Sequence, residues 1–179
     1  MPMTPEELNI TDVVNFVWST TLDLHVEPMA KIPSASTSQP AMEAQVHIAG
    51  DWQGVVVLHA APSLVANVAQ RMFSLGDQPP TLDDMQDAFG EVANITGGNI
   101  KGLLSEGGAH LSLPTVVQGR DYQVSIPGSR QVARGVFACQ GQPLVVTILQ
   151  ADPVGGDAKA MGLPRQVATR HDARGSQTS

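Results

Sequence analysis

The sequence is poor in charge, in cysteine and in long apolar runs, and each shortage excludes a class of protein. Only 15% of the 179 residues are charged. The single cysteine, Cys139, cannot form a disulfide within the chain, which is typical of a reducing compartment. The apolar runs fall short of the roughly 18–20 residues that span a membrane, and the start, MPMTPEELN, lacks a signal-peptide pattern. We therefore expect a soluble, cytoplasmic protein.

The charge that is present is acidic and unevenly distributed. The formal net charge is −7, and residues 151–179 carry four basic and three acidic side chains, so residues 1–150 carry −8. Nucleic acids and anionic membranes both attract basic surfaces. The sequence therefore predicts neither nucleic acid nor membrane as a partner.

Metal and nucleotide signatures are also missing from the sequence. The five histidines are scattered, without the HxxxH or HExxH spacing of a metal site, so we predict none. The run GGNIKG at 97–102 lacks the GK[ST] end of a P-loop. Cys139 lies in a strand-like pattern without an activating neighbour, and we interpret it as a core thiol.

Apolar periodicity predicts an α+β domain over residues 1–150 and a disordered tail over 151–179. Residues 27–41, rich in proline and serine, are predicted to form a long loop. The predicted helices run from Thr4–Pro5 to about 26, from 62 or 63 to the DQPP at 77–80, and from Thr81 through the glycine-rich stretch. The predicted strands cover 44–50, 54–60, 110–117, 122–126, 133–140 and 143–150.

The glycine-rich stretch DAFGEVANITGGNIKG, residues 87–102, has helical periodicity although each helical glycine costs roughly 0.5–1 kcal/mol relative to alanine. One predicted face is a core stripe of Met85, Phe89, Val92, Thr96, Ile100 and Leu103. The opposite face carries Asp87, Glu91, Asn94, Gly98 and Lys101. Glu91 and Asn94 are three residues apart and are therefore neighbours on the helix surface.

Two interpretations of the glycines remain open from this pattern. In the first, the glycines leave the polar face accessible to the backbone of another protein. In the second, Glu91 and Asn94 are ordinary solvated residues, and the glycines mark close packing of the helix on a sheet.

Asp87, Glu91, Asn94 and the more distant Pro114 resemble the signature of the CheC/CheX/FliY chemotaxis phosphatases. In that signature an acid or serine precedes a glutamate by four residues, an asparagine follows three residues later, and a proline comes about twenty residues further on. The surrounding sequence, over about 5–150, is similar as well. It includes GDWQGVVVLHA, ELNITDVVNFVWSTTLDLHVEP, EVANITGGNIKGLL and HLSLPTVVQG.

The number of motif copies makes the resemblance CheX-like. CheC-like members have two copies of the glutamate–asparagine pair, and CheX-like members have one. The first predicted helix here has only Asp12 and Asn15, and Leu8 stands where an acid or serine would precede them. We interpret this pair as a degenerate echo of the motif.

The resemblance implies a pseudo-symmetric α+β sandwich with long helices on an antiparallel sheet. It implies a phosphatase that acts on a phosphorylated CheY-like response regulator, with Asn94 positioning the attacking water and Glu91 engaging a lysine of the regulator. Asp87, Gly98 and Lys101 would contact the partner, and Pro114 would set the following strand. The chain would need no cofactor of its own, because Mg²⁺ is supplied by the regulator. Two alternatives are a non-catalytic module that binds a receiver domain and a structural domain that forms homodimers.

Overall fold

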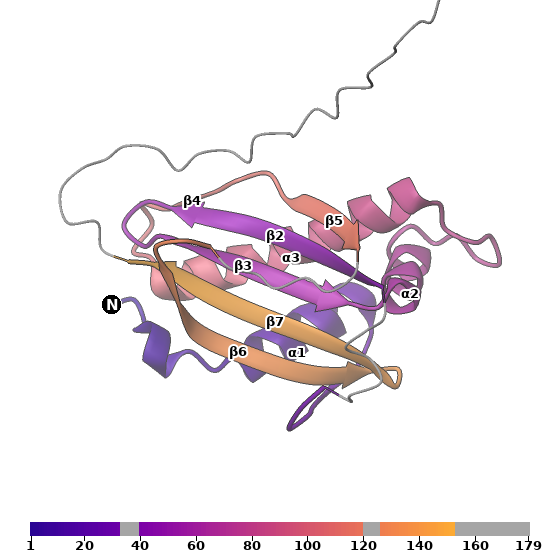
Figure 1. The fold of residues 1–179 in the computed structure, drawn as a ribbon, viewed down its shortest axis with the longest axis horizontal. Helices are drawn as coiled ribbons and strands as arrows, with labels where there is room; N and C mark the ends of the chain where they lie inside the picture. Colours follow the sequence, from indigo (N-terminus) through magenta and orange to yellow (C-terminus); the bar gives the residue numbers. More distant parts are fainter. Residues whose placement is uncertain (33–39, 120–125, 153–179) are drawn as a thin grey trace, which may run out of the picture.

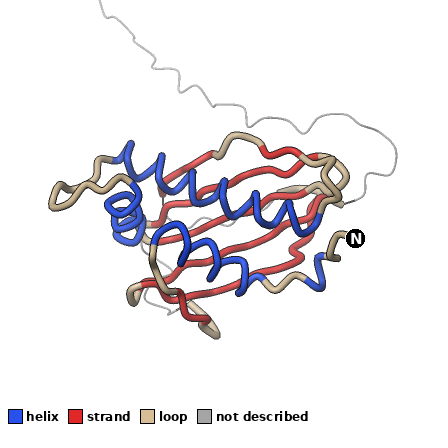
Figure 2. The backbone as a smooth tube through the Cα atoms, turned by 180° about the vertical axis from the view of Figure 1, so that it is seen from behind, coloured by secondary structure: helices blue, strands red, loops and turns tan. Residues whose placement is uncertain are grey.

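The helices of the described residues all pack on the same face of one antiparallel sheet (Figure 1). The computed structural model describes residues 1–32, 40–119 and 126–152. In these residues, seven strands run in the order β1-β6-β7-β3-β2-β4, and β5 also pairs with β2. Figure 2 shows the other side, where α1 and α3 cross the sheet and α2 lies at one end. The predicted α+β fold with long helices on an antiparallel sheet is confirmed.

Along the chain, helices alternate with groups of strands. The helical segments are η1 Pro5–Glu7 (a 3-10 turn), α1 Ile10–Leu22, α2 Pro62–Met72 and α3 Leu82–Leu104. The strands are β1 Val26–Pro28, β2 Ala41–Ala49, β3 Gly54–Ala60, β4 His110–Leu111, β5 Thr115–Gly119, β6 Ser129–Cys139 and β7 Gln142–Ala151. Within this described part, none of the helices is both long and apolar enough to cross a bilayer.

The centre of the sheet consists of two hairpins, β2–β3 and β6–β7, joined by pairing of β3 with β7. Strand β3 covers the residues predicted from its valine-rich pattern. In β2 the side chains alternate, and Met42, Ala44 and Val46 are fully buried in the core under the helices. The predicted strands at 133–140 and 143–150 are correct in place, but β6 begins earlier, at Ser129.

The first predicted helix is wrong at both ends. Thr4 and Glu7 form the predicted capping box, but it caps only the 3-10 turn η1, because Leu8 is extended. The α-helix begins afresh at Ile10, where the Asn9 side chain accepts a hydrogen bond from the backbone N–H of Thr11. It ends at Leu22, because Asp23 adopts a left-handed conformation with φ of 51°.

The predicted loop at 27–41 is shorter than expected, because its ends belong to strands. Glu27 and Pro28 lie in β1, which pairs with the C-terminal end of β6, and Ala41 already belongs to β2. The strand predicted at 122–126 and the tail predicted from 151 lie mostly outside the described residues. Ala151 itself is the last residue of β7.

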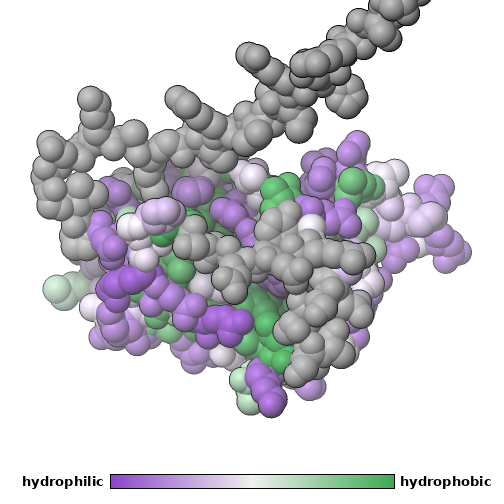
Figure 3. Space-filling view, viewed as in Figure 1, coloured by the Kyte–Doolittle hydropathy of each residue, from purple (hydrophilic) through white to green (hydrophobic). Residues whose placement is uncertain are grey.

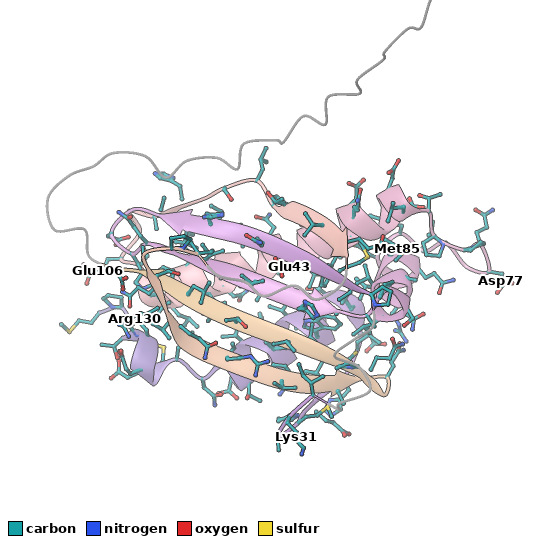
Figure 4. All side chains as sticks on the ribbon, viewed as in Figure 1. Lys31, Glu43, Asp77, Met85, Glu106 and Arg130 are labelled. Atoms are coloured by element: carbon teal, nitrogen blue, oxygen red, sulfur yellow. The ribbon has the colours of Figure 1, made fainter. Side chains whose placement is uncertain are left out.

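The face of the sheet opposite the helices presents a mixed surface (Figure 3). Hydrophobic residues appear there between hydrophilic ones. Glu43 of β2 projects from the central part of this face (Figure 4), where it is only 3% exposed and accepts a hydrogen bond of 2.6 Å from Gln45 Nε2. The candidate site lies elsewhere, on the helical side of the molecule.

Candidate functional site

Helix α3 carries the predicted motif and begins at the predicted cap. The Thr81 hydroxyl accepts a hydrogen bond of 3.1 Å from the Asp84 backbone N–H. The Asp84 carboxylate in turn accepts from the Thr81 N–H and hydroxyl, and these bonds hold the pKa of Asp84 below its ordinary value. Figure 4 labels Met85, in the first turn of the helix, and Glu106, just after its last residue, at opposite ends of the sheet. The motif residues therefore lie along the middle of this long helix.

The core-facing side of α3 is broader than the stripe that the sequence predicts. Its middle members, Phe89, Val92, Thr96 and Ile100, are fully buried as predicted. The prediction is wrong at the ends, because Met85 is only half-buried and Leu103 is 37% exposed. The buried surface instead extends sideways over small residues, namely Ala88, Gly90, Ala93 and Gly97. Small side chains there let the helix lie close to the sheet.

The opposite side of α3 presents the polar residues of the motif, as predicted. Asp87 and Glu91 are exposed, whereas Asn94, Gly98 and Lys101 are half-buried. Among the described residues, neither the Glu91 carboxylate nor the Asn94 amide has a hydrogen-bond partner.

Asn99, further along the same helix, provides a contrast to Asn94. Its Nδ2 donates a hydrogen bond of 2.9 Å to the Ile95 carbonyl, one turn back in α3. The amide of Asn99 is thus partly satisfied by its own helix. The amide of Asn94 remains available for a ligand from outside this part of the chain.

Two of the helix glycines are explained by packing on the protein's own sheet. A Cβ at Gly97 would lie 2.5 Å from Val46 Cγ1 of β2, which is too close for any side chain. A Cβ at Gly90 would lie 3.3 Å from Pro114 Cγ, so Gly90 gives room to the motif proline. For these two positions the packing interpretation of the glycines is correct.

The other two helix glycines have more space around them. A Cβ at Gly98 would lie 3.8 Å from Leu111 Cδ1 of β4, an ordinary contact, and a Cβ at Gly102 would have no neighbour within 4 Å among the described residues. Gly98 therefore leaves space beside the motif, but the protein's own Leu111 borders that space. For a Cβ at Gly98, Leu111 is the only neighbour within 4 Å among the described residues.

The segment from Leu111 to Pro114 runs alongside the motif. Leu111 borders Gly98 and Pro114 borders Gly90, two glycines that lie about 12 Å apart along the helix axis. Asn94 is four residues from each of them and falls midway between. The β4–β5 connection, from Leu111 to Pro114, therefore forms a wall along the side of the helix that carries Gly90, Asn94 and Gly98. Asn94 is half-buried there, whereas Glu91 is exposed.

The predicted strand at 110–117 is wrong in one respect, because it is interrupted within this wall. It forms two separate strands, β4 and β5, both paired with β2. Residues 112–114 lie between them, and Leu113 is 89% exposed. The sequence interpretation missed Leu113 as a surface residue, although a proline inside a strand pattern is a signal for a bulge.

The C-terminal end of α3 is tied to the β2–β3 turn by Asp51. The Ser105 hydroxyl donates a hydrogen bond of 2.5 Å to Asp51 Oδ1, and the Glu106 N–H donates one of 2.9 Å to Oδ2. These bonds, that from Ser105 first, hold the pKa of the Asp51 carboxyl below its ordinary value. Trp52, beside it, is buried and covers Gly54, so it belongs to the core.

The echo of the motif on α1 lies on a separate helix. Asp12 is exposed and Asn15 is half-buried, and Phe16 next to them is 58% exposed. Leu8, which occupies the place of the first acid, is buried and lies before the helix begins. The structure therefore does not bring this pair together with the α3 motif.

Neither the single cysteine nor a cluster of metal-ligating side chains contributes to the candidate site in the described residues. Cys139 is fully buried, as predicted for a core thiol, and burial raises the pKa of its thiol group. Over residues 1–32, 40–119 and 126–152, the structure has no group of three or more His, Cys, Asp or Glu side chains that could hold a metal ion.

The fold is shared with solved structures of chemotaxis proteins. CheX from Desulfovibrio desulfuricans is 21% identical, with a TM-score of 0.64 over 79% of this chain and 95% of that one. CheX from Vibrio vulnificus is 18% identical, with a TM-score of 0.63 over 81% and 98%. A chain of the CheX-CheY-BeF3-Mg complex from Borrelia burgdorferi is 16% identical, with a TM-score of 0.60 over 80% and 96%.

The family follows from the sequence match. The family model of "Chemotaxis phosphatase CheX" matches residues 42–137, more than half of the chain. The protein therefore belongs to the CheX family, and the CheX-like resemblance of its motifs is confirmed. A comparison with curated proteins gave no significant match.

Proposed function

We propose that this chain hydrolyses the aspartyl phosphate of a CheY-type response regulator, with Asn94 and Glu91 of α3 as the acting residues. The observation that supports this most is the setting of Asn94. Asn94 is half-buried beside the Leu111–Pro114 wall, its amide is unpaired within the described chain, and Glu91 is exposed one turn away. An unpaired amide held at a protein surface can bind and orient a water molecule.

In the proposed reaction, a water oxygen bonds to phosphorus as the bond between phosphorus and the aspartyl oxygen breaks. The products are the free carboxylate of the regulator and inorganic phosphate, and the proton released by the water passes to phosphate or solvent. The Asn94 carbonyl accepts a hydrogen bond from the water, and its NH₂ donates to a phosphoryl oxygen. Phosphoryl transfer depends mainly on such positioning and on charge balance.

Glu91 has a different role in this proposal. Its carboxylate pairs with the lysine of the regulator and so fixes the register in which the two proteins meet. Asp87 and Lys101 lie on the same side of α3 and contact the rim of the partner. Gly98, between them, allows the partner backbone to approach. Mg²⁺ belongs to the regulator, so the chain supplies only side chains.

Two comparisons support a receiver domain as the partner. The chain belongs to a family of chemotaxis phosphatases, and one structure of similar fold is a CheX in complex with CheY. The acidic face of α3 agrees with a partner that presents a lysine.

A phosphate-release assay tests the proposal directly. CheY-type receivers of the same organism are phosphorylated, and phosphate is followed with and without this chain. We expect faster release from at least one receiver. If an excess of the chain leaves the rate of phosphate loss from each receiver unchanged, the proposed activity is wrong.

The role of Glu91 is tested separately by binding. Glu91→Lys places like charges together and should weaken binding to the beryllofluoride-activated receiver as well as turnover. Asp77→Lys, in the exposed loop before α3, is the matched control. Calorimetry that gives wild-type affinity for Glu91→Lys would contradict the pairing with lysine.

A further inference from the structure

The interruption between β4 and β5 is a bulge in a strand pair that is otherwise regular. Leu111 pairs with Ile48 and Thr115 pairs with Gln45, so three residues of this strand lie opposite two residues of β2. One of the three is Pro114, which has no N–H to donate to the ladder. Bulges of this kind change the direction in which side chains point and are frequent beside functional sites.

The extra residue changes which side chain faces α3. Leu111 contacts the helix at Gly98, and regular alternation would turn Leu113 to the same side. Instead, Pro114 and Val116 face the helix at Gly90. Leu113 is left 89% exposed, and among the large hydrophobic residues of the described chain only Met1 is more exposed.

Leu113 is exposed although its backbone is well held. The Ser112 N–H donates a hydrogen bond of 2.9 Å to the His47 carbonyl. The Ser112 hydroxyl accepts one of 3.0 Å from the His47 N–H and donates one of 2.8 Å to the Leu113 carbonyl. The β4–β5 connection therefore presents Leu113 on ordered backbone, so little conformational entropy is lost when another molecule covers it.

The position of Leu113 connects it to the candidate site. It lies between Leu111, which borders Gly98, and Pro114, which borders Gly90, and Asn94 is midway between these two glycines. A protein that binds the Asn94 amide therefore comes close to this wall. Single exposed leucines are common on protein surfaces. This one is distinguished by the bulge, the hydrogen bonds that hold it, and its place beside Asn94.

We propose that Leu113 is an apolar anchor that docks the receiver domain next to Asn94, an inference that rests on the proposed function. Its partner is an apolar depression on the receiver surface beside the phosphorylated aspartate. Asp87 and Glu91 hold the receiver through charge, and Leu113 holds it through apolar burial. Leu113 thus positions the receiver and takes no part in the chemical step.

The test compares Leu113→Ser with Leu113→Met and with Phe16→Ser. Phe16 is another exposed large apolar residue, but it lies on α1, away from the wall. Binding to beryllofluoride-activated receivers is measured by calorimetry, and KM and kcat are measured by phosphate release. Leu113→Ser should raise Kd and KM by about 10- to 100-fold, the effect of losing one buried leucine, with kcat within about threefold of wild type. Leu113→Met and Phe16→Ser should behave as wild type.

The other outcomes of this test overturn the anchor, the proposed reaction or both. Wild-type Kd for Leu113→Ser overturns the anchor, and so does a reduced kcat with unchanged Kd. A change in the sedimentation of the chain itself, with receiver binding unaffected, means that Leu113 contacts a second copy, and the proposal is wrong. If the wild-type chain binds a receiver without hydrolysing it, the proposed reaction fails, and the Kd of Leu113→Ser still decides the anchor. If no receiver binds at all, both proposals fail.

Discussion

The two long helices α1 and α3 lie on the same face of the sheet and carry the same acid–amide spacing, yet their surroundings differ. Asp12 and Asn15 of α1 match Glu91 and Asn94 of α3 in spacing. Figure 2 shows the two helices crossing the sheet, and only α3 lies over the β2 side, where the bulged strand is attached. The comparison teaches that the spacing of two side chains does not by itself make a site.

Small residues account for much of the difference. Three residues after the asparagine, α3 has Gly97 against Val46, whereas α1 has the fully buried Trp18. Four residues before and after the asparagine, α3 has glycines that border the β4–β5 wall, and α1 has Thr11 and Ser19. The glycines of α3 leave room for the β4–β5 connection, and the side chains of α1 occupy the corresponding positions.

The largest expected effect separates the two asparagines. Asn94→Ala should reduce stimulated phosphate release by roughly two orders of magnitude, because a positioned water is lost. Asn15→Ala should leave the rate within about twofold, because the α1 pair lacks the first acid and the wall. The measurement is the rate of phosphate release at saturating chain.

Asn99→Ala is the matched control for Asn94→Ala, since Asn99 already bonds to its own helix. All three variants should keep the wild-type circular dichroism spectrum. A folded Asn94→Ala variant with wild-type activity would remove this residue from the mechanism, and an inactive Asn15→Ala variant would make α1 a second site.

The next effect concerns stability and the close approach of α3 to the sheet. Gly97→Ala should lower the free energy of unfolding by about 1–3 kcal/mol, because the new Cβ meets Val46 Cγ1 at 2.5 Å. Urea unfolding measures this loss. An unchanged midpoint would mean that α3 can move away from β2 at little cost.

Gly102→Ala is the matched change in the same helix and should have the opposite sign. Its Cβ would have no neighbour within 4 Å in the described structure. Replacing an exposed helical glycine with alanine should raise the free energy of unfolding by up to about 1 kcal/mol. Thermal and urea unfolding both report this gain, and a loss would show that Gly102 needs a conformation that alanine disfavours.

The smallest expected effect is a loss of stability at acid pH, at the C-terminal end of α3, where Asp51 accepts hydrogen bonds from Ser105 and Glu106. The pKa of Asp51 is lowered from its ordinary value of 3.8 in the folded protein. Its stabilising effect is therefore fully present above pH 3.8 and is lost as the pH falls below that value, through the folded pKa.

Asp51→Asn should accordingly be less stable than wild type at pH 7, and the difference should shrink below about pH 4. Urea midpoints at several pH values measure this. Asp77→Asn, in an exposed loop, is the matched change of charge. A difference that stays constant from pH 7 to 3 would mean that the Asp51 carboxylate does not link the turn to Ser105.

Local patterns in the sequence were sufficient for most elements. The valine-rich run of β3, the Thr81–Asp84 capping box and the polar face of α3 all follow from the spacing of neighbouring residues. The family could also be predicted, because its motif lies mostly on one helix. The roles of Glu91 and Asn94 in catalysis stay predictions.

The tertiary structure alone decided what surrounds that helix. Which glycines pack on the sheet depends on Val46 of β2 and on Pro114 of the β4–β5 connection, and both lie more than 20 residues away in the sequence. Pairing with β2 splits the predicted strand at the bulge and leaves Leu113 in solvent. Helical periodicity is local and can be read from one segment, whereas strand register and helix–sheet contact depend on partners that the segment itself does not contain.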